Sequence, residues 1–108
     1  MSTLYLCDVT VEKFNKKHSK KIQATIKANN LGDLAVDDES INACGNVWLY
    51  AGRSGADYTS DLSAQIWKAN GGKYCEVIVR MACMDDLPYD EYCYEESEYR
   101  DIYDARHN

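Results

Sequence analysis

Hydrophobic and polar positions alternate over much of residues 3–14, which are also rich in β-forming side chains. Such a period of two predicts a strand with one buried face. Residues 21–28 alternate more regularly, and their apolar positions are Ile22, Ala24, Ile26 and Ala28. Because residues 15–20 between the two segments are polar, we expect a turn there and an antiparallel hairpin over the whole region.

The middle of the chain has a weaker pattern. Residues 33–44 carry only a sparse apolar stripe at helical spacing, so we expect a short helix or a loop there. Residues 46–52 contain a run of Val, Trp, Leu and Tyr, which predicts a buried or half-buried strand. The polar stretch 53–61 that follows is expected to be a loop.

Residues 62–70 are compatible with two structures. Their apolar residues fit a helix capped by Ser60 or Asp61, but they also fit one arm of a hairpin that turns at the following Asn-Gly-Gly. We favour the hairpin, because residues 73–84 come next and are strongly β-prone around Val77 to Val79.

The chain ends in an acidic, tyrosine-rich segment, residues 85–108. This segment holds nine of the 18 acidic residues and five of the nine tyrosines, but only two arginines. Its formal charge is about −7, whereas residues 1–84 sum to about +1. Disordered acidic tails are usually poor in aromatic residues. Since Tyr92, Tyr99 and Tyr103 recur at helical spacing, we expect a helix or an ordered extension, with Pro88 near its start.

Together these patterns predict an α+β fold, in which an antiparallel sheet of four to five strands is joined by a short helix and an acidic, tyrosine-rich C-terminal helix or extension. We expect residues 1–84 to form an antiparallel β-rich domain. Residues 85–108 are expected to pack on this domain or to project from it. A chain of 108 residues suffices for one compact domain. Nothing in the sequence indicates export or membrane insertion, so we expect a cytoplasmic protein.

Recognisable catalytic chemistry is missing from the sequence. His18 lies in a basic turn and His107 is next to the last residue, so neither has an evident scaffold for proton transfer. The carboxylates crowd an exposed segment, where desolvation cannot tune a pKa. We therefore expect no enzyme activity, no catalytic residue and no cofactor.

The five cysteines are odd in number and have no Cys-x-x-Cys spacing, so we expect reduced, structural thiols. A zinc site formed by Cys83, Cys93 and His107 is disfavoured because its spacing matches no common pattern. The acidic run 37–39 lacks the alternating ligands of a calcium loop, and we expect it to be solvated. No metal site is predicted.

The net charge of −6 argues against direct binding of nucleic acid, which requires a basic surface. One local exception is the lysine-rich stretch 13–21. We expect it to be the solvated tip of the first hairpin, and contact with phosphate is the alternative.

We instead expect the acidic residues and tyrosines of the C-terminal segment to bind a protein partner. The predicted partner-binding residues are Asp85, Asp86, Tyr89, Asp90, Glu91, Tyr92, Tyr94, Glu95, Glu96, Glu98, Tyr99, Asp101 and Tyr103. Carboxylates at this density can occupy a site built for phosphates, and tyrosines supply buried contact area. The expected partner is thus a protein with a basic nucleic-acid-binding groove, and not nucleic acid itself or a membrane. The chain itself would be a monomer or a homodimer.

In its length, its acidic run YDEYCYEESEYRDIYD and its lack of catalytic signatures, the chain resembles small acidic phage proteins that block host defence, such as anti-CRISPR proteins and restriction-system DNA mimics. The resemblance covers roughly the last quarter of the chain. It implies inhibition, in the cytoplasm of a bacterial host, by occlusion of a nucleic-acid-binding site on a CRISPR complex or nuclease. The alternative is a small regulatory or assembly module, such as a homodimer that joins the basic turn of one chain to the acidic end of another.

Overall fold

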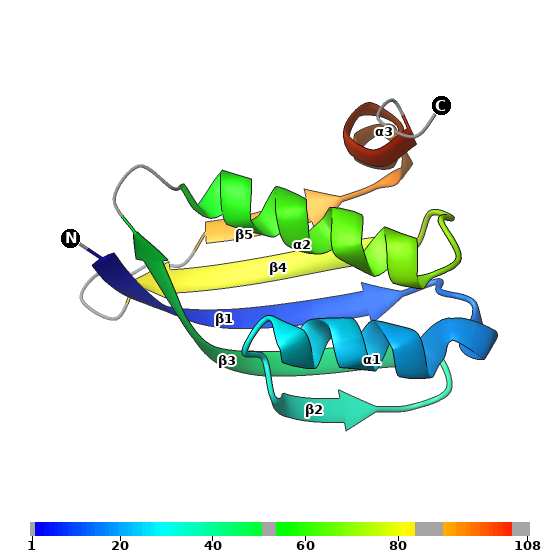
Figure 1. The fold of residues 1–108 in the computed structure, drawn as a ribbon, viewed down its shortest axis with the longest axis horizontal. Coiled ribbons are helices and arrows are strands. Elements are labelled where there is room, and N and C mark those ends of the chain that lie inside the picture. Colours follow the sequence, from blue (N-terminus) through cyan, green and yellow to red (C-terminus); the bar gives the residue numbers. More distant parts are fainter. Residues whose placement is uncertain (1, 51–53, 84–89, 105–108) are drawn as a thin grey trace.

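The structure is a computed structural model that describes residues 2–50, 54–83 and 90–104. A five-stranded antiparallel sheet carries two long helices on one face, and a short C-terminal helix lies beside the second of them (Figure 1). The predicted α+β class is confirmed, as are the antiparallel sheet and the tyrosine-containing C-terminal helix.

The sheet has the strand order β2-β3-β1-β4-β5, and every neighbouring pair is antiparallel. Its strands are β1 (Ser2–Glu12), β2 (Asp33–Val36), β3 (Ser40–Tyr50), β4 (Glu76–Cys83) and β5 (Asp90–Tyr94). The helical elements are η1 (Lys16–His18), α1 (Ser19–Ala28), α2 (Gly55–Ala69), α3 (Glu96–Tyr99) and the π-helical η2 (Arg100–Asp104). Elements β1 to β4 follow the β-α-β-β-α-β order of the split βαβ, or ferredoxin-like, topology. This topology hosts many functions and identifies none.

The core lies between the sheet and the two long helices. Each central strand turns alternate side chains toward the helices, as the pleat requires. The buried set from the strands is Cys7, Val9, Val11, Ile41, Ala43, Val47, Leu49, Val77, Val79 and Met81, and the set from α1 and α2 is Ile22, Ile26, Tyr58, Leu62, Ile66 and Trp67. Full burial of one such aliphatic side chain contributes about 1.5–3 kcal/mol, so this layer is the main source of stability.

The predicted strand over residues 21–28 is wrong, because this segment is helix α1. Ile22 and Ile26 are four positions apart, a spacing that fits one face of a helix as well as one face of a strand. Both are fully buried, whereas Ala24 and Ala28 are exposed, and this separation of the two pairs excludes a strand. The lysine-rich stretch is consequently no hairpin tip, but forms η1 and the first turn of α1.

Residues 33–44 were expected to form a helix or a loop, but they form β2 and the beginning of β3. Asp37 organises the turn between these strands. Its carboxylate accepts hydrogen bonds from the backbone N–H groups of Glu39 and Ser40, at 2.8 and 2.7 Å. These bonds lower the pKa of Asp37. An Asp side chain that bonds to the backbone two residues further on is typical of a tight turn, and here it overrides the weak helical spacing.

The hairpin favoured for residues 62–70 and the loop predicted for 53–61 are also wrong, because helix α2 covers most of both. The helix begins one residue after Ser54, which forms a reciprocal capping box with Asp57. It ends at Ala69, and Asn70 is its C-cap. Gly71 and Gly72 follow with φ angles of 75° and 77° and close the helix as a left-handed cap. The predicted strands are confirmed for residues 46–50, which belong to β3, and for residues 76–83, which form β4. Residues 51, 52 and 84 of the predicted strands lie outside the described residues.

The C-terminal segment begins as a strand before it becomes helical. Residues 90–94 form β5 and pair with β4, so Tyr92 does not share a helix with Tyr99 and Tyr103 as predicted. Pro88 lies outside the described residues. Because β5 extends the same sheet, the described part of residues 85–108 packs on the rest of the chain.

Candidate protein-interaction surface on the open face of the sheet

The predicted partner-binding residues separate into two groups by exposure. The acidic side chains of Asp90, Glu91, Glu95, Glu96 and Asp101 are exposed, and Glu98 is half-buried. The four tyrosines of this segment that the structure describes lie in the core or pack against it. Asp85, Asp86 and Tyr89 lie outside the described residues. The structure therefore places most of the described acidic side chains of the predicted site on the surface and its described tyrosines in or against the core.

Three of these tyrosines surround the indole of Trp67. Tyr94 and Tyr103 are only 7% and 8% exposed, while Tyr92 and Tyr99 are half-buried. The ring centroids of Tyr94, Tyr99 and Tyr103 lie 6.3, 5.2 and 6.4 Å from that of Trp67, all with edge-to-face geometry. Tyr94 and Tyr103 thus belong to the core and expose little surface to a partner, and their predicted role in partner binding stays a prediction.

Hydrogen bonds fix this aromatic cluster. The hydroxyl oxygens of Thr59 and Tyr94 lie 2.5 Å apart, and the Trp67 indole N–H donates to the Cys75 carbonyl at 2.8 Å. Burial raises the pKa of Tyr94, so its hydroxyl stays protonated at neutral pH. The tyrosines act as anchors that hold the acidic segment against α2.

Several of the exposed carboxylates are already engaged. Glu91 accepts a hydrogen bond of 2.8 Å from Arg80 Nε, and this bond is the main reason that the pKa of Glu91 is lowered. Glu96 pairs with Arg100 at 2.9 Å, one helical turn away. Exposed pairs of this kind contribute about 0–1 kcal/mol and break readily for a better partner. Within the described part of the chain, the side-chain carboxylates of Asp90 and Asp101 have no hydrogen-bond or ion-pair partner.

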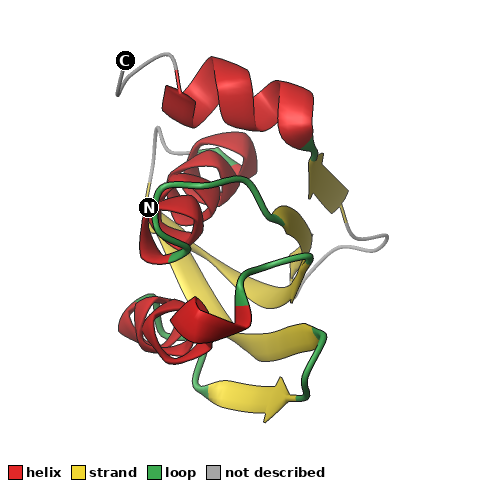
Figure 2. Cartoon of the chain, turned by 90° about the vertical axis from the view of Figure 1, so that its right-hand side faces the viewer, coloured by secondary structure: helices red, strands yellow, loops and turns green. Residues whose placement is uncertain are grey.

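The opposite face of the sheet is not covered by any described element, since both long helices lie on one side (Figure 2). Large apolar side chains are exposed at one end of this open face: Trp48 is 56% exposed, Tyr50 72% and Leu6 47%. The register places Leu4 directly opposite Trp48, and Leu6 follows Leu4 on the same face. We call Leu4, Leu6, Trp48 and Tyr50 the aromatic corner. Exposed apolar groups gathered in this way are typical of an interaction site.

A row of four charged side chains and one thiol crosses the sheet next to the aromatic corner. In strand order from β2 to β5 it consists of Asp33, Cys44, Asp8, Arg80 and Glu91. Toward the other end of the face, Glu12 of β1 lies opposite Glu76 of β4. We call Asp8, Glu12, Asp33, Glu76 and Glu91, together with the aromatic corner, the acidic sheet face. Among the described residues, two cations pair with these carboxylates. Arg80 pairs with Glu91, and Lys13 Nζ lies 3.6 Å from Glu76 Oε2.

The two thiols on this face are not activated. Burial and the neighbouring Asp33 carboxylate raise the pKa of Cys44, and burial with Glu91 raises the pKa of Cys93. A nucleophilic thiol needs a lowered pKa, whereas each of these thiols has a raised pKa and donates to a carboxylate.

Trp48 and Tyr50 were missed as site residues because they lie in an uninterrupted apolar run, Val47 to Tyr50. Such a run predicts burial on both faces of a strand. The available signal was the alternation of side chains along a strand. In a sheet with helices on one face only, either Val47 and Leu49 or Trp48 and Tyr50 must point toward the uncovered face. The structure buries the first pair.

In the described residues, no group of three or more His, Cys, Asp or Glu side chains is arranged to hold a metal ion. His107 of the disfavoured zinc site lies outside them. Nor does any described helix have the length and apolar character needed to cross a membrane. Comparisons of the chain with protein-family models, curated proteins and solved structures found no match.

Proposed function

We propose that this chain is a non-enzymatic interaction protein that inhibits a partner by covering a basic nucleic-acid-binding site with its acidic sheet face. The observation that carries the proposal is the placement of exposed Trp48 and Tyr50 beside a row of carboxylates on one uncovered face. Trp and Tyr are the residues most enriched in binding hot spots, and they would fill apolar pockets between the partner's cations.

The backbone of this face is pre-organised for binding. Its carboxylates are attached to hydrogen-bonded strands that lie about 4.8 Å apart, so little backbone entropy is lost on association. Negative groups spaced by a few ångströms can replace the phosphates of a nucleic acid. The net charge of −6 would also speed the encounter with a basic groove.

The state of the thiols supports a binding role over a catalytic one. Burial raises the pKa of Cys7 and of Cys75 to about 12, so neither forms a thiolate at neutral pH. The general resemblance to phage inhibitors of host defence directs the choice of partner toward nucleases and CRISPR complexes of a bacterial host cell.

The first test compares immobilised wild-type protein with two variants as bait in a bacterial lysate. The variant D8N/E12Q/D33N removes three charges from the acidic sheet face, and E95Q/E96Q/D101N removes the same number from the C-terminal segment. A partner that wild type and the second variant retain, and the first variant loses, would locate binding on the sheet. The reverse pattern would return the site to the C-terminal carboxylates.

The decisive measurement is competition with labelled duplex DNA or RNA on the isolated partner, at low and high salt. We expect mutually exclusive binding and a steep loss of affinity with salt, with each lost charge contact costing about 1–3 kcal/mol. Trp48→Ala should weaken binding with little change in the salt dependence, because mainly apolar area is lost. Simultaneous binding of both ligands at saturation would rule out occlusion.

A second candidate is the regulatory or assembly module, including a homodimer. It is favoured by one observation: α1 carries a series of exposed lysines, so basic and acidic surfaces coexist on the same chain. A concentration-dependent dimer that dissociates at high salt, detected by sedimentation velocity, would support this alternative.

A further inference from the structure

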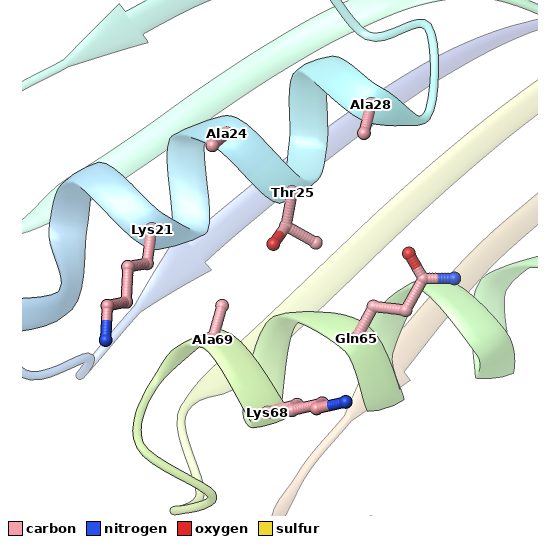
Figure 3. Close-up of a pocket in the computed structure, with 7 residues that line it drawn as sticks. All are labelled: Lys21, Ala24, Thr25, Ala28, Gln65, Lys68 and Ala69. Atoms are coloured by element: carbon pink, nitrogen blue, oxygen red, sulfur yellow. The ribbon is translucent and has the colours of Figure 1, made fainter.

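Helices α1 and α2 leave a groove of about 480 Å³ between them on the surface of the molecule. Figure 3 shows how the two helices line it: Thr25 and Ala69 face one another, and Lys21 and Lys68 lie along its edge. The volume lies within the range of sites that bind small ligands or short peptide segments. None of these residues belongs to the acidic sheet face.

The floor of the groove is apolar and shallow. Ala24 and Ala28 are four residues apart on the exposed side of α1, and Ala69 contributes a methyl group from α2. One end is closed by a hydrogen bond of 2.9 Å from Asn29 Nδ2 to Gln65 Oε1, which links the two helices. A second bond of 2.8 Å, from Asn29 Nδ2 to the Thr25 carbonyl, fixes the Asn29 side chain. The floor therefore offers space and apolar contact between two connected walls.

The groove lies in a cationic part of the surface. Lys21 and Lys68 line it, and the same helical layer carries further exposed lysines at positions 17, 20 and 27. None of these five lysines has an ion-pair partner within the described ranges. Lys16 is not one of them, because it lies beside Asp37 and Asp38. The charge around the groove is thus opposite in sign to the net charge of −6 of the whole chain. It favours an anionic occupant.

We propose that this groove binds an acidic segment of a second protein. The carboxylates of the segment would pair with Lys21 and Lys68, and a small apolar side chain would rest on Ala24, Ala28 and Ala69. With the acidic sheet face on the other side of the molecule, the chain would contact two partners of opposite charge. This inference does not depend on the proposed inhibitory function.

Nucleic acid fits the groove less well than an acidic protein segment. A phosphate backbone has no apolar group that would use the alanine floor, and the groove lining contains no aromatic ring on which a base could stack. A second copy of this chain is also a poorer occupant. Its sheet carboxylates lie on a five-stranded sheet, which is too broad to enter a groove between two helices.

The test is fluorescence anisotropy of the full chain with a fluorescein-labelled acidic peptide, in which glutamates alternate with leucine and alanine at helical spacing. The comparison probes are the same peptide with glutamine in place of glutamate and a labelled oligothymidylate of similar length. At physiological ionic strength, where the screening length is about 8 Å, we expect K21E/K68E to weaken binding of the acidic peptide at least about tenfold. The matched control K16E/K73E changes net charge equally outside the groove lining, and should alter affinity by less than about threefold.

A second variant, A24Q/A28Q, fills the floor and keeps every lysine. It should weaken peptide binding at least about fivefold, because the apolar contact is lost. All the substituted positions lie on the surface, and far-UV circular dichroism checks that each variant is folded. Equal losses from K21E/K68E and K16E/K73E, or no loss from A24Q/A28Q, would reduce the effect to general charge attraction and overturn the proposal.

Two further outcomes would also overturn it. The first is oligothymidylate binding as tightly as the acidic peptide and with the same dependence on Lys21 and Lys68, which would assign the groove to nucleic acid. The second is a dimer in sedimentation velocity that K21E/K68E dissociates, which would assign it to a second copy of the chain.

Discussion

The phenolic hydroxyl of Tyr99 donates a hydrogen bond of 2.6 Å to the carbonyl oxygen of Gly72. Gly72 belongs to the left-handed turn that ends α2, and Tyr99 lies at the end of α3, 27 residues further along the chain. The ring of Tyr99 also packs edge-on against Trp67, at a centroid distance of 5.2 Å. This contact fastens the acidic C-terminal helix to the end of the main helix layer.

Tyr99→Phe should lower the free energy of unfolding by about 0.5–1.5 kcal/mol, because it removes this hydrogen bond and keeps the ring. Tyr99→Ala should cost at least about 2 kcal/mol, because the ring contacts are lost as well. Urea denaturation measures both. Tyr50→Phe is the matched control, since Tyr50 is 72% exposed, and it should leave stability unchanged. An equal effect of the two Tyr→Phe changes would contradict the anchoring role.

Removal of residues 85–108 should destabilise the whole domain. The truncation deletes β5, α3 and η2, and exposes the Trp67 ring that Tyr94 and Tyr103 cover. In a W48F background, Trp67 is the only tryptophan, so its fluorescence reports this site alone. We expect a red-shifted emission and a lower urea midpoint than in full-length W48F. Unchanged emission and midpoint would mean that the segment is dispensable for the fold.

Two buried hydroxyls on α2 should respond in opposite directions to removal. Thr59 shares a hydrogen bond with Tyr94, and Thr59→Val would leave the Tyr94 hydroxyl unpaired at a cost of about 1–3 kcal/mol. The Ser63 hydroxyl is buried and has no hydrogen-bond partner among the described residues. Ser63→Ala should therefore be neutral or stabilising by up to about 1 kcal/mol. Thermal unfolding of the two variants gives the comparison, and a destabilising Ser63→Ala would show that its hydroxyl is satisfied in solution.

The buried thiols should make the fold sensitive to alkaline pH. Burial is the main cause that raises the pKa of Cys7 from 9.0 to about 12, and it raises the pKa of Cys75 to about 12 as well. The unfolded chain loses these protons from about pH 9 upward, while the folded chain retains them. The contribution to stability is thus complete below pH 9, and falls with rising pH by up to about 1.4 kcal/mol per pH unit for each thiol.

Urea denaturation between pH 8 and pH 10.5 measures this slope. The variant C7A/C75A should show a shallower decline than wild type, although the added cavities lower its stability at every pH. The lysines and tyrosines also titrate in this range, but they are common to both proteins and cancel in the comparison. Parallel curves would contradict the assignment of the slope to the buried thiols.

Local pattern was enough to predict the α+β class, the strand around Val77 to Val79 and the concentration of negative charge after residue 85. Each of these depends on near neighbours in the chain: β-branched residues favour strands, and charge is a property of composition. The helix at 19–28 could not be separated from a strand in this way. Ile22 and Ile26 satisfy both periods, and only their packing on the sheet decides between them.

The candidate site depended still more on tertiary structure. The sequence showed that tyrosines accompany the acidic residues, but not that Tyr94 and Tyr103 would turn inward onto Trp67. It showed Trp48 and Tyr50 in an apolar run, but not that the helices would cover the other face of β3. Hydrophobicity along a chain tells which residues can be buried. Which of them are buried is decided by the element that packs against each face, because there are fewer covered positions in this fold than there are apolar side chains to fill them.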